Sequence, residues 1–97
     1  MHPEPSDLLI TYQLKGDIFY AQGQLDKALE SFQKSLDLNP SVAYAIHPYC
    51  QKALILSQLG RFQEALDTCE YASMLYPHRA EFYNLKLRIQ ASLNLGG

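Results

Sequence analysis

The sequence predicts an all-α fold made of two similar helix pairs and a fifth helix. Three observations lead to this prediction. The chain matches itself when shifted by 37 residues, its apolar residues recur at helical spacing, and glycine or proline separates the apolar segments. Such self-similarity is typical of proteins that stack small supersecondary units, because one unit alone cannot bury its apolar face.

The repeat is visible as pairs of residues of similar size. The shift pairs Tyr12 with Tyr49, Gly16 with Ala53, Phe19 with Leu56, Gly23 with Gly60, Ala28-Leu29 with Ala65-Leu66, Phe32 with Cys69, Ser35 with Ala72 and Pro40 with Pro77. The pattern restarts at Tyr83, six residues after Pro77, whereas Tyr49 lies nine residues after Pro40. The underlying period is therefore 34 residues, with three residues added between Pro40 and Tyr49.

Each unit is expected to hold two helices, and the boundaries follow from caps and breakers. The expected helices cover about residues 7–22, 25–38, 41–59, 62–75 and 79–94. Ser6 is the expected N-cap of the first helix, and Gly23 and Gly60 form the turns inside the units. The three added residues amount to about one turn, so the third helix is expected to start early, at Ser41, and to kink at Pro48.

Composition limits the kind of protein this chain is. Its 97 residues, with 8 Lys+Arg against 10 Asp+Glu and a formal net charge of −2, describe one small domain, residues 1–97, without the basic surface that nucleic-acid binding needs. No apolar run approaches the ~18–20 residues of a membrane span, and residues 1–5 lack a secretory signal pattern. Two cysteines are too few to staple a secreted fold, which favours the cytoplasm.

Residues 9–94 resemble the tetratricopeptide repeat family. The matching motif is Tyr12-x2-Lys15-Gly16-x2-Phe19 with Gly23, Ala28, Phe32 and Pro40, and again Tyr49-x2-Lys52-Ala53-x2-Leu56 with Gly60, Ala65, Cys69 and Pro77. The resemblance implies a right-handed superhelical stack of antiparallel helix pairs, an α-solenoid. Repeat one then covers about 9–42, an inserted turn 43–45, repeat two about 46–79 and a terminal helix about 80–95. Lys15 and Lys52 depart from the family, which usually has leucine there.

The resemblance implies a non-enzymatic scaffold or adaptor whose concave groove receives a peptide or helix of a partner protein. By the family's geometry, the groove residues are Gln13, Asp17, Tyr20, Ala21, His47, Cys50, Leu54, Ser57, Glu81, Asn84 and Arg88. Family members that bind the acidic tail of heat-shock chaperones use lysine, arginine and asparagine in a clamp. The corresponding residues here are Gln13, Asp17, Gln51, Glu81 and Leu85, so that tail is not an expected partner.

No enzyme, metal or cofactor motif is present in the sequence. His47 and Cys50 share a helical face, with His78 and Glu81 at the corresponding place of the next unit, but a metal site needs further ligands at fixed distances. These residues are better explained as polar residues lining the groove. Cys69 replaces the aromatic Phe32 and is expected to be a buried core residue.

The aromatic residues divide into two expected groups. Those expected in the core are Tyr12, Phe19, Phe32, Tyr49, Phe62 and Tyr83, and those free to face a partner are Tyr20, Tyr44, Tyr71, Tyr76 and Phe82. On the last helix, Tyr83 and Leu87 are expected to face the preceding pair. An uncovered stripe for self-association is then expected at Phe82, Leu85, Ile89 and Leu93.

Two alternatives to an adaptor stay open on these observations. The first is a homo-oligomerisation element, in which two copies form a homodimer through the terminal helix. The second is a repeat segment of a larger protein. Two repeats are fewer than the ~3 that usually fold independently, which is consistent with either alternative.

Overall fold

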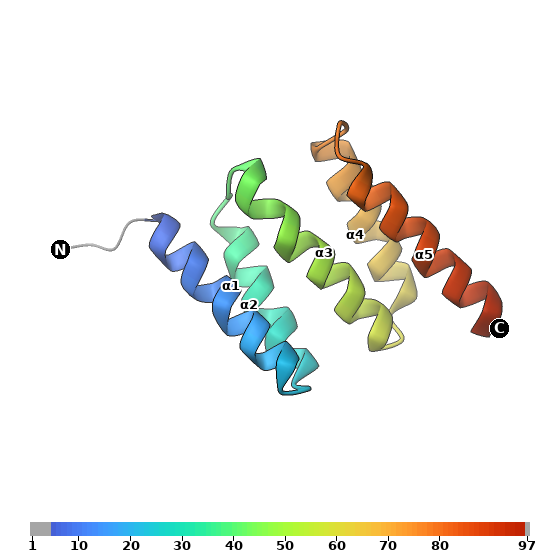
Figure 1. Cartoon of the computed structure of the whole chain (residues 1–97), viewed down its shortest axis with the longest axis horizontal. Helices are drawn as coiled ribbons and strands as arrows, with labels where there is room; N and C mark the ends of the chain where they lie inside the picture. Colours follow the sequence, from blue (N-terminus) through green and yellow to red (C-terminus); the bar gives the residue numbers. More distant parts are fainter. Residues whose placement is uncertain (1–4, 97) are drawn as a thin grey trace.

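The structure is a computed structural model that describes residues 5–96 of the chain. It contains five α-helices: α1 (Pro5–Ala21), α2 (Leu25–Asp37), α3 (Val42–Gln58), α4 (Phe62–Leu75) and α5 (Ala80–Gly96). They follow one another along the longest axis of the molecule (Figure 1). The predicted all-α fold is therefore confirmed, and the boundaries of α4 agree with those expected from the sequence.

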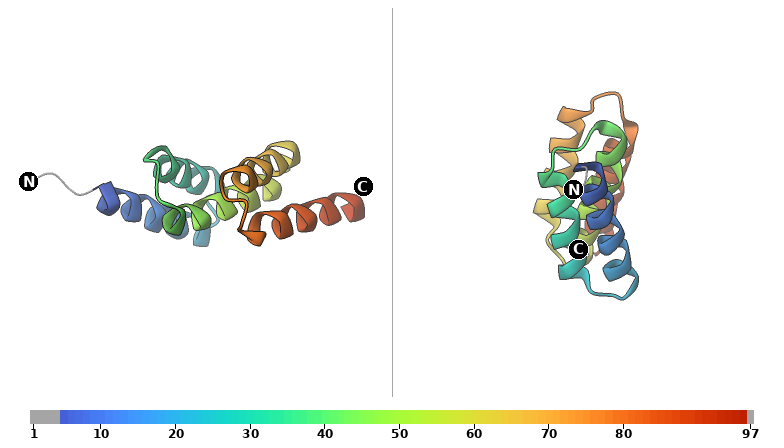
Figure 2. Two further views of the ribbon diagram at one scale, coloured as in Figure 1. Left: turned by 90° about the horizontal axis from the view of Figure 1, so that it is seen from above. Right: turned by 90° about the vertical axis from the view of Figure 1, so that its left-hand side faces the viewer.

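The helices form two layers. Figure 2 shows α2 and α4 in one layer and α1, α3 and α5 in the other, and the molecule measures 52 × 32 × 16 Å. Each helix of the α2/α4 layer packs against the two neighbouring helices of the other layer. No helix within residues 5–96 has the length and hydropathy that crossing a membrane requires.

The contact between α1 and α2 depends on Gly16. A Cβ atom built on Gly16 would lie 2.7 to 2.9 Å from three ring atoms of Phe32, which is fully buried. The absence of a side chain at Gly16 therefore lets the phenyl ring lie directly against the α1 backbone. Glycine has a different role at Gly23 and Gly60, whose φ angles of 76° and 80° are left-handed and reverse the chain inside each pair.

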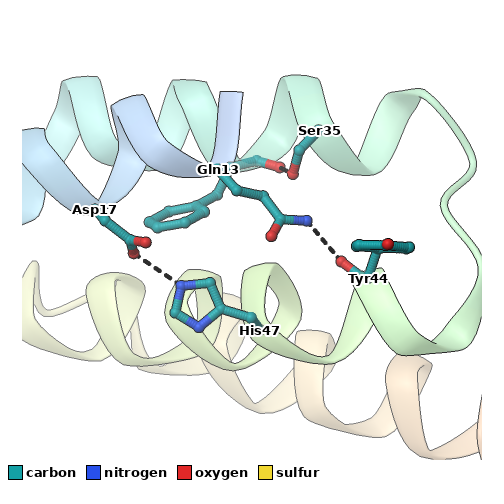
Figure 3. Close-up of polar contacts among 6 residues, drawn as sticks. Gln13, Asp17, Ser35, Tyr44 and His47 are labelled. Carbon is teal, nitrogen blue, oxygen red and sulfur yellow. Dashed lines mark hydrogen bonds and ion pairs between the residues drawn. The ribbon is translucent and has the colours of Figure 1, made fainter. Parts of the chain in front are cut away.

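The predicted start of α3 is confirmed, because Ser41 is its N-cap residue and the helix continues through Pro48. Proline has no N–H to donate to the carbonyl of Tyr44, four residues earlier. In the structure, Gln13 Nε2 of α1 donates a hydrogen bond of 2.7 Å to that carbonyl oxygen (Figure 3). The backbone acceptor that Pro48 leaves free thus becomes a point of attachment between α1 and α3.

Replacement of Pro48 by alanine should reduce the contribution of the Gln13–Tyr44 hydrogen bond to stability. We expect Gln13→Ala to destabilise the native chain by about 0.5–1 kcal/mol, since the bond is partly exposed to water. In a Pro48→Ala background the restored N–H of α3 satisfies Tyr44, so the same Gln13→Ala change should have almost no effect. Urea unfolding of the four proteins of this double-mutant cycle measures the coupling. Equal effects of Gln13→Ala in both backgrounds would contradict this account.

Two predictions about helix faces and caps are wrong. Helix α1 begins at Pro5, so Ser6 lies inside it and is not its N-cap. On α5 the expected faces are exchanged: Phe82, Leu85 and Ile89 are only 1%, 6% and 3% exposed, whereas Tyr83 and Leu87 are 60% and 46% exposed.

The core explains why the faces of α5 are exchanged. Leu85 and Ile89 belong to a buried cluster in which they pack with residues of α3 and α4, namely Ala53, Leu56, Ala65 and Cys69. Leu93, the last member of the expected stripe, is half-buried. This stripe is therefore the docking face of α5 within the chain, and it is not an exposed surface for a second copy. An ion pair, Lys86 Nζ to Glu70 Oε1 at 2.7 Å, also joins α5 to α4.

Candidate partner-binding groove

The residues expected to line a groove lie on the layer formed by α1, α3 and α5. Between α1 and α3, these side chains bond to the neighbouring helix. His47 Nε2 lies 2.8 Å from Asp17 Oδ1, as Figure 3 shows, and because a carboxylate only accepts, this nitrogen carries the proton. The imidazole ring also packs against the Phe32 ring in a T-shaped arrangement, with 5.6 Å between the ring centroids.

A third bond of this kind lies near the other end of the two helices. Gln58 Nε2 of α3 donates to the hydroxyl oxygen of Tyr20 on α1 at 2.7 Å. Together with the Gln13 and Asp17 contacts, it ties α1 to α3 along their length. The α1/α3 half of the predicted groove is thus crossed by hydrogen bonds within the chain.

The α3/α5 half is different, because it contains a pocket. A cavity of about 290 Å³ lies between these helices and is lined by Cys50, Leu54, Glu81, Asn84, Leu85 and Arg88. Five of these six residues belong to the predicted groove set. Leu85 was assigned to the self-association stripe instead, although helical spacing places it one turn from both Glu81 and Arg88. We call this cavity the α3/α5 pocket.

The α3/α5 pocket has an apolar floor and a charged rim. Leu54 and Cys50 are half-buried, whereas Glu81, Asn84 and Arg88 are exposed. Burial raises the pKa of the Cys50 thiol, and the nearby Glu81 carboxylate raises it further. The carboxylate of Glu81 also lies 3.5 Å from the guanidinium of Arg79. The pocket therefore suits an apolar side chain with polar groups on either side, and its thiol is a poor nucleophile.

The second thiol lies in the core, as expected. Cys69 is fully buried, and burial raises its pKa to about 11. Both cysteines are free. Within residues 5–96, the histidine, cysteine and carboxylate side chains form no group of three that could hold a metal ion.

An aromatic cluster joins the ends of α3, α4 and α5. Tyr49 lies 6.1 to 6.2 Å from the rings of Tyr71, Tyr76 and Phe82. Phe82 was expected to face a partner, and its burial shows that this prediction is wrong. A signal for its position was present in the repeat: the 34-residue period places Phe82 on Pro48 and Ile89 on Ile55, both of which are buried between the units.

This architecture, in which two helix pairs and a further helix form two layers, defines a class of helical-repeat scaffold. Residues 10–42 and residues 46–78 each match the tetratricopeptide repeat. The chain belongs to the tetratricopeptide repeat family, whose members are non-catalytic modules that bind other proteins.

Two relatives share part of the sequence. The chain is 32% identical over 72 residues to the Hsp70-Hsp90 organising protein of Plasmodium falciparum (isolate 3D7), in an alignment covering 73% of this chain and 12% of that protein. It is 43% identical over 54 residues to an uncharacterised protein of Methanocaldococcus jannaschii, covering 56% of this chain and 59% of the relative. The chain thus spans less than two thirds of either relative. No solved structure matches it significantly.

Proposed function

We propose that this chain is a non-enzymatic adaptor that binds a peptide or helix of a partner protein across α1, α3 and α5. The observation that carries this proposal is the α3/α5 pocket, which coincides with residues that the family's geometry assigns to the groove. The similarity of the chain to a protein named Hsp70-Hsp90 organising protein also supports a role in binding other proteins. Preformed helices favour binding because little of the receptor must become ordered.

The chemistry of the pocket indicates the kind of segment that fits. An apolar side chain of the partner lies against Leu54 and Leu85, and its neighbours meet Glu81 on one side and Arg88 on the other. An acidic chaperone tail is a poor fit. It would meet the carboxylates of Asp17 and Glu81. Gln13, Gln51 and Leu85 occupy further positions of the family's clamp, and none of these side chains is basic.

The remaining parts of the proposal concern cofactors and location. The chain is one domain of two repeats and a terminal helix, and it acts without metal or cofactor. The two free cysteines, one of them fully buried, suit the reducing cytoplasm. The net charge of −2 supports a protein partner over nucleic acid or an anionic membrane.

Selection of peptides from a random library on the 97-residue chain tests this proposal. We expect the selected peptides to carry an apolar anchor and to bind Arg88→Glu and Leu54→Asp variants about tenfold or more weakly, as anchor contacts usually require. Tyr83→Ser is the matched control, because Tyr83 is exposed on the opposite side of α5. Fluorescence anisotropy with labelled peptides measures each affinity.

The outcomes of this experiment also separate the alternatives. Peptides that bind the wild-type chain and both pocket variants equally well would contradict the groove. Tyr83 and Leu87 are exposed apolar residues on the outer face of α5, and this observation favours homo-oligomerisation, or continuation in a larger protein, through that face. If the wild-type chain self-associates and only Tyr83→Ser loses this self-association, the second candidate is supported.

A further inference from the structure

A second cleft lies on the opposite layer of the molecule, between α2 and α4. It consists of two adjoining cavities of about 770 and 480 Å³, which share Gln33, Asp37, Lys52, Asp67 and Thr68. Residues of α3, including Lys52 and Leu56, form its floor. We call these two cavities together the outer cleft. It is larger than the α3/α5 pocket and shares no lining residue with it.

The outer cleft carries an excess of negative charge. Its lining contains five carboxylates, and two of them are neutralised within the chain: Glu30 lies 3.3 Å from Lys34 Nζ, and Glu64 accepts from Arg61. Asp26, Asp37 and Asp67 form no ion pair within residues 5–96. Asp37 and Asp67 accept instead from the neutral amides of Gln33 and Gln63 at 2.9 Å.

Aromatic rings form one end of the outer cleft. Tyr49 and Tyr71 line the smaller cavity together with Asp37 and Asp67, and their ring centroids are 6.2 Å apart. The face of a tyrosine ring attracts a cation, and more strongly when water is partly excluded. Two carboxylates and two tyrosines around one cavity therefore make an environment in which a cationic side chain is favoured.

The first repeat shows the same tyrosine position occupied by a cation. Tyr12, which the repeat pairs with Tyr49, has the ammonium of Lys34 5.8 Å from its ring centroid. The residue of repeat two that corresponds to Lys34 is Tyr71. Repeat two thus has a second aromatic ring where repeat one has the cation. The ring of Tyr49 lines the cleft, where a cation from outside the chain can reach it.

We propose that the outer cleft binds an arginine side chain of a protein partner, held between the carboxylates of Asp37 and Asp67 and against the rings of Tyr49 and Tyr71. Guanidinium is the preferred group because it pairs with carboxylates through several N–H donors and also stacks on aromatic rings. This binding surface lies on the opposite layer from the groove of the proposed function, so one chain binds two segments at once (Figure 2).

Lys52 opposes this ligand and supplies a sensitive test. Its side chain is half-buried on the floor of both cavities, and no carboxylate of the described residues lies within ion-pair distance of its ammonium. Burial lowers the pKa of Lys52, while Asp37 and Glu64 raise it. Its positive charge competes with an incoming guanidinium for Asp37, so removal of that charge should strengthen binding.

Titration with N-acetyl-arginine amide, followed by NMR of the labelled 97-residue chain, tests the proposal. We expect chemical-shift changes around Tyr49 and Tyr71, and weaker binding at high salt because the contact is partly electrostatic. Asp37→Asn with Asp67→Asn should weaken binding about fivefold or more, and Lys52→Met should strengthen it about two- to fivefold. Tyr71→Lys restores the arrangement of repeat one and should abolish binding.

The controls distinguish this cleft from the groove. N-acetyl-glutamate amide should not bind, and Glu81→Gln, which changes the α3/α5 pocket alone, should leave arginine binding unchanged. Shift changes around Cys50 and Arg88 in place of Tyr49 would overturn the outer cleft and leave the proposed function intact. Equal weakening by Lys52→Met and by the double aspartate variant would show a structural effect and also overturn it. So would an absence of any shift change at saturating arginine amide.

Discussion

Gly16→Leu is expected to unfold the first helix pair. The leucine Cβ alone would lie within 3 Å of the Phe32 ring, and that ring is fully buried, so α1 and α2 must separate. Overpacking at such contacts costs about 1–3 kcal/mol for small insertions, and a whole isobutyl group should reach the upper end or exceed it. In a domain of this size the melting temperature should fall by on the order of 10–20 °C, which circular dichroism measures.

A matched variant on the same helix controls for the effect of leucine itself. Ala21→Leu places the same side chain at an exposed position of α1 and should shift the melting temperature by a few degrees at most. Ala65→Leu, at a fully buried position of the second pair, should resemble Gly16→Leu. Identical melting of Gly16→Leu and Ala21→Leu would refute the close contact between α1 and α2.

Leu85→Glu combined with Ile89→Glu is expected to detach α5 and unfold the second pair. Both side chains pack into the cluster that contains Ala53, Leu56 and Cys69. Carboxylates at these buried positions would lose their hydration, and the leucine and isoleucine contacts would be lost as well. The free energy of unfolding should fall by about 4 kcal/mol or more, as measured by urea denaturation.

The corresponding change on the other face of α5 is the control. Tyr83→Glu with Leu87→Glu introduces the same two charges at exposed positions, so its effect on stability should stay within about 1 kcal/mol. The contrast between the two double variants distinguishes the two possible rotations of α5 about its axis. If the Tyr83 variant unfolds and the Leu85 variant does not, the observed rotation is incorrect.

The wrong prediction for α5 shows that a repeat pattern gives the register of a helix without specifying which of its faces is buried. The period correctly places Tyr83 in register with Tyr12 and Tyr49, but those two tyrosines are half-buried and contact the second helix of their own pairs. Within residues 5–96, α5 has no such following helix. The residues that it buries are those facing the preceding repeat, at the positions equivalent to Pro48 and Ile55.

The candidate groove was predicted in part. The family's geometry, carried over by resemblance, assigned Cys50, Leu54, Asn84 and Arg88 to one groove, and the structure brings them around one pocket. That this pocket receives a partner stays a prediction. The resemblance did not show that Gln13, Asp17 and Tyr20 of α1 bond to α3. Those contacts depend on side-chain conformations across two helices 30 or more residues apart in sequence.

By itself, the sequence determined the helices, their turns and their pairing in two repeats. Apolar spacing, Gly23, Gly60 and the prolines act within a few residues, so their effects are legible in the chain. Only the tertiary structure decided which face of α5 is buried, how the carbonyl left free by Pro48 is satisfied, and that a charged cleft opens between α2 and α4. The physical reason is that burial and side-chain bonding depend on which neighbours are present, and the spacing of residues within one helix does not specify them.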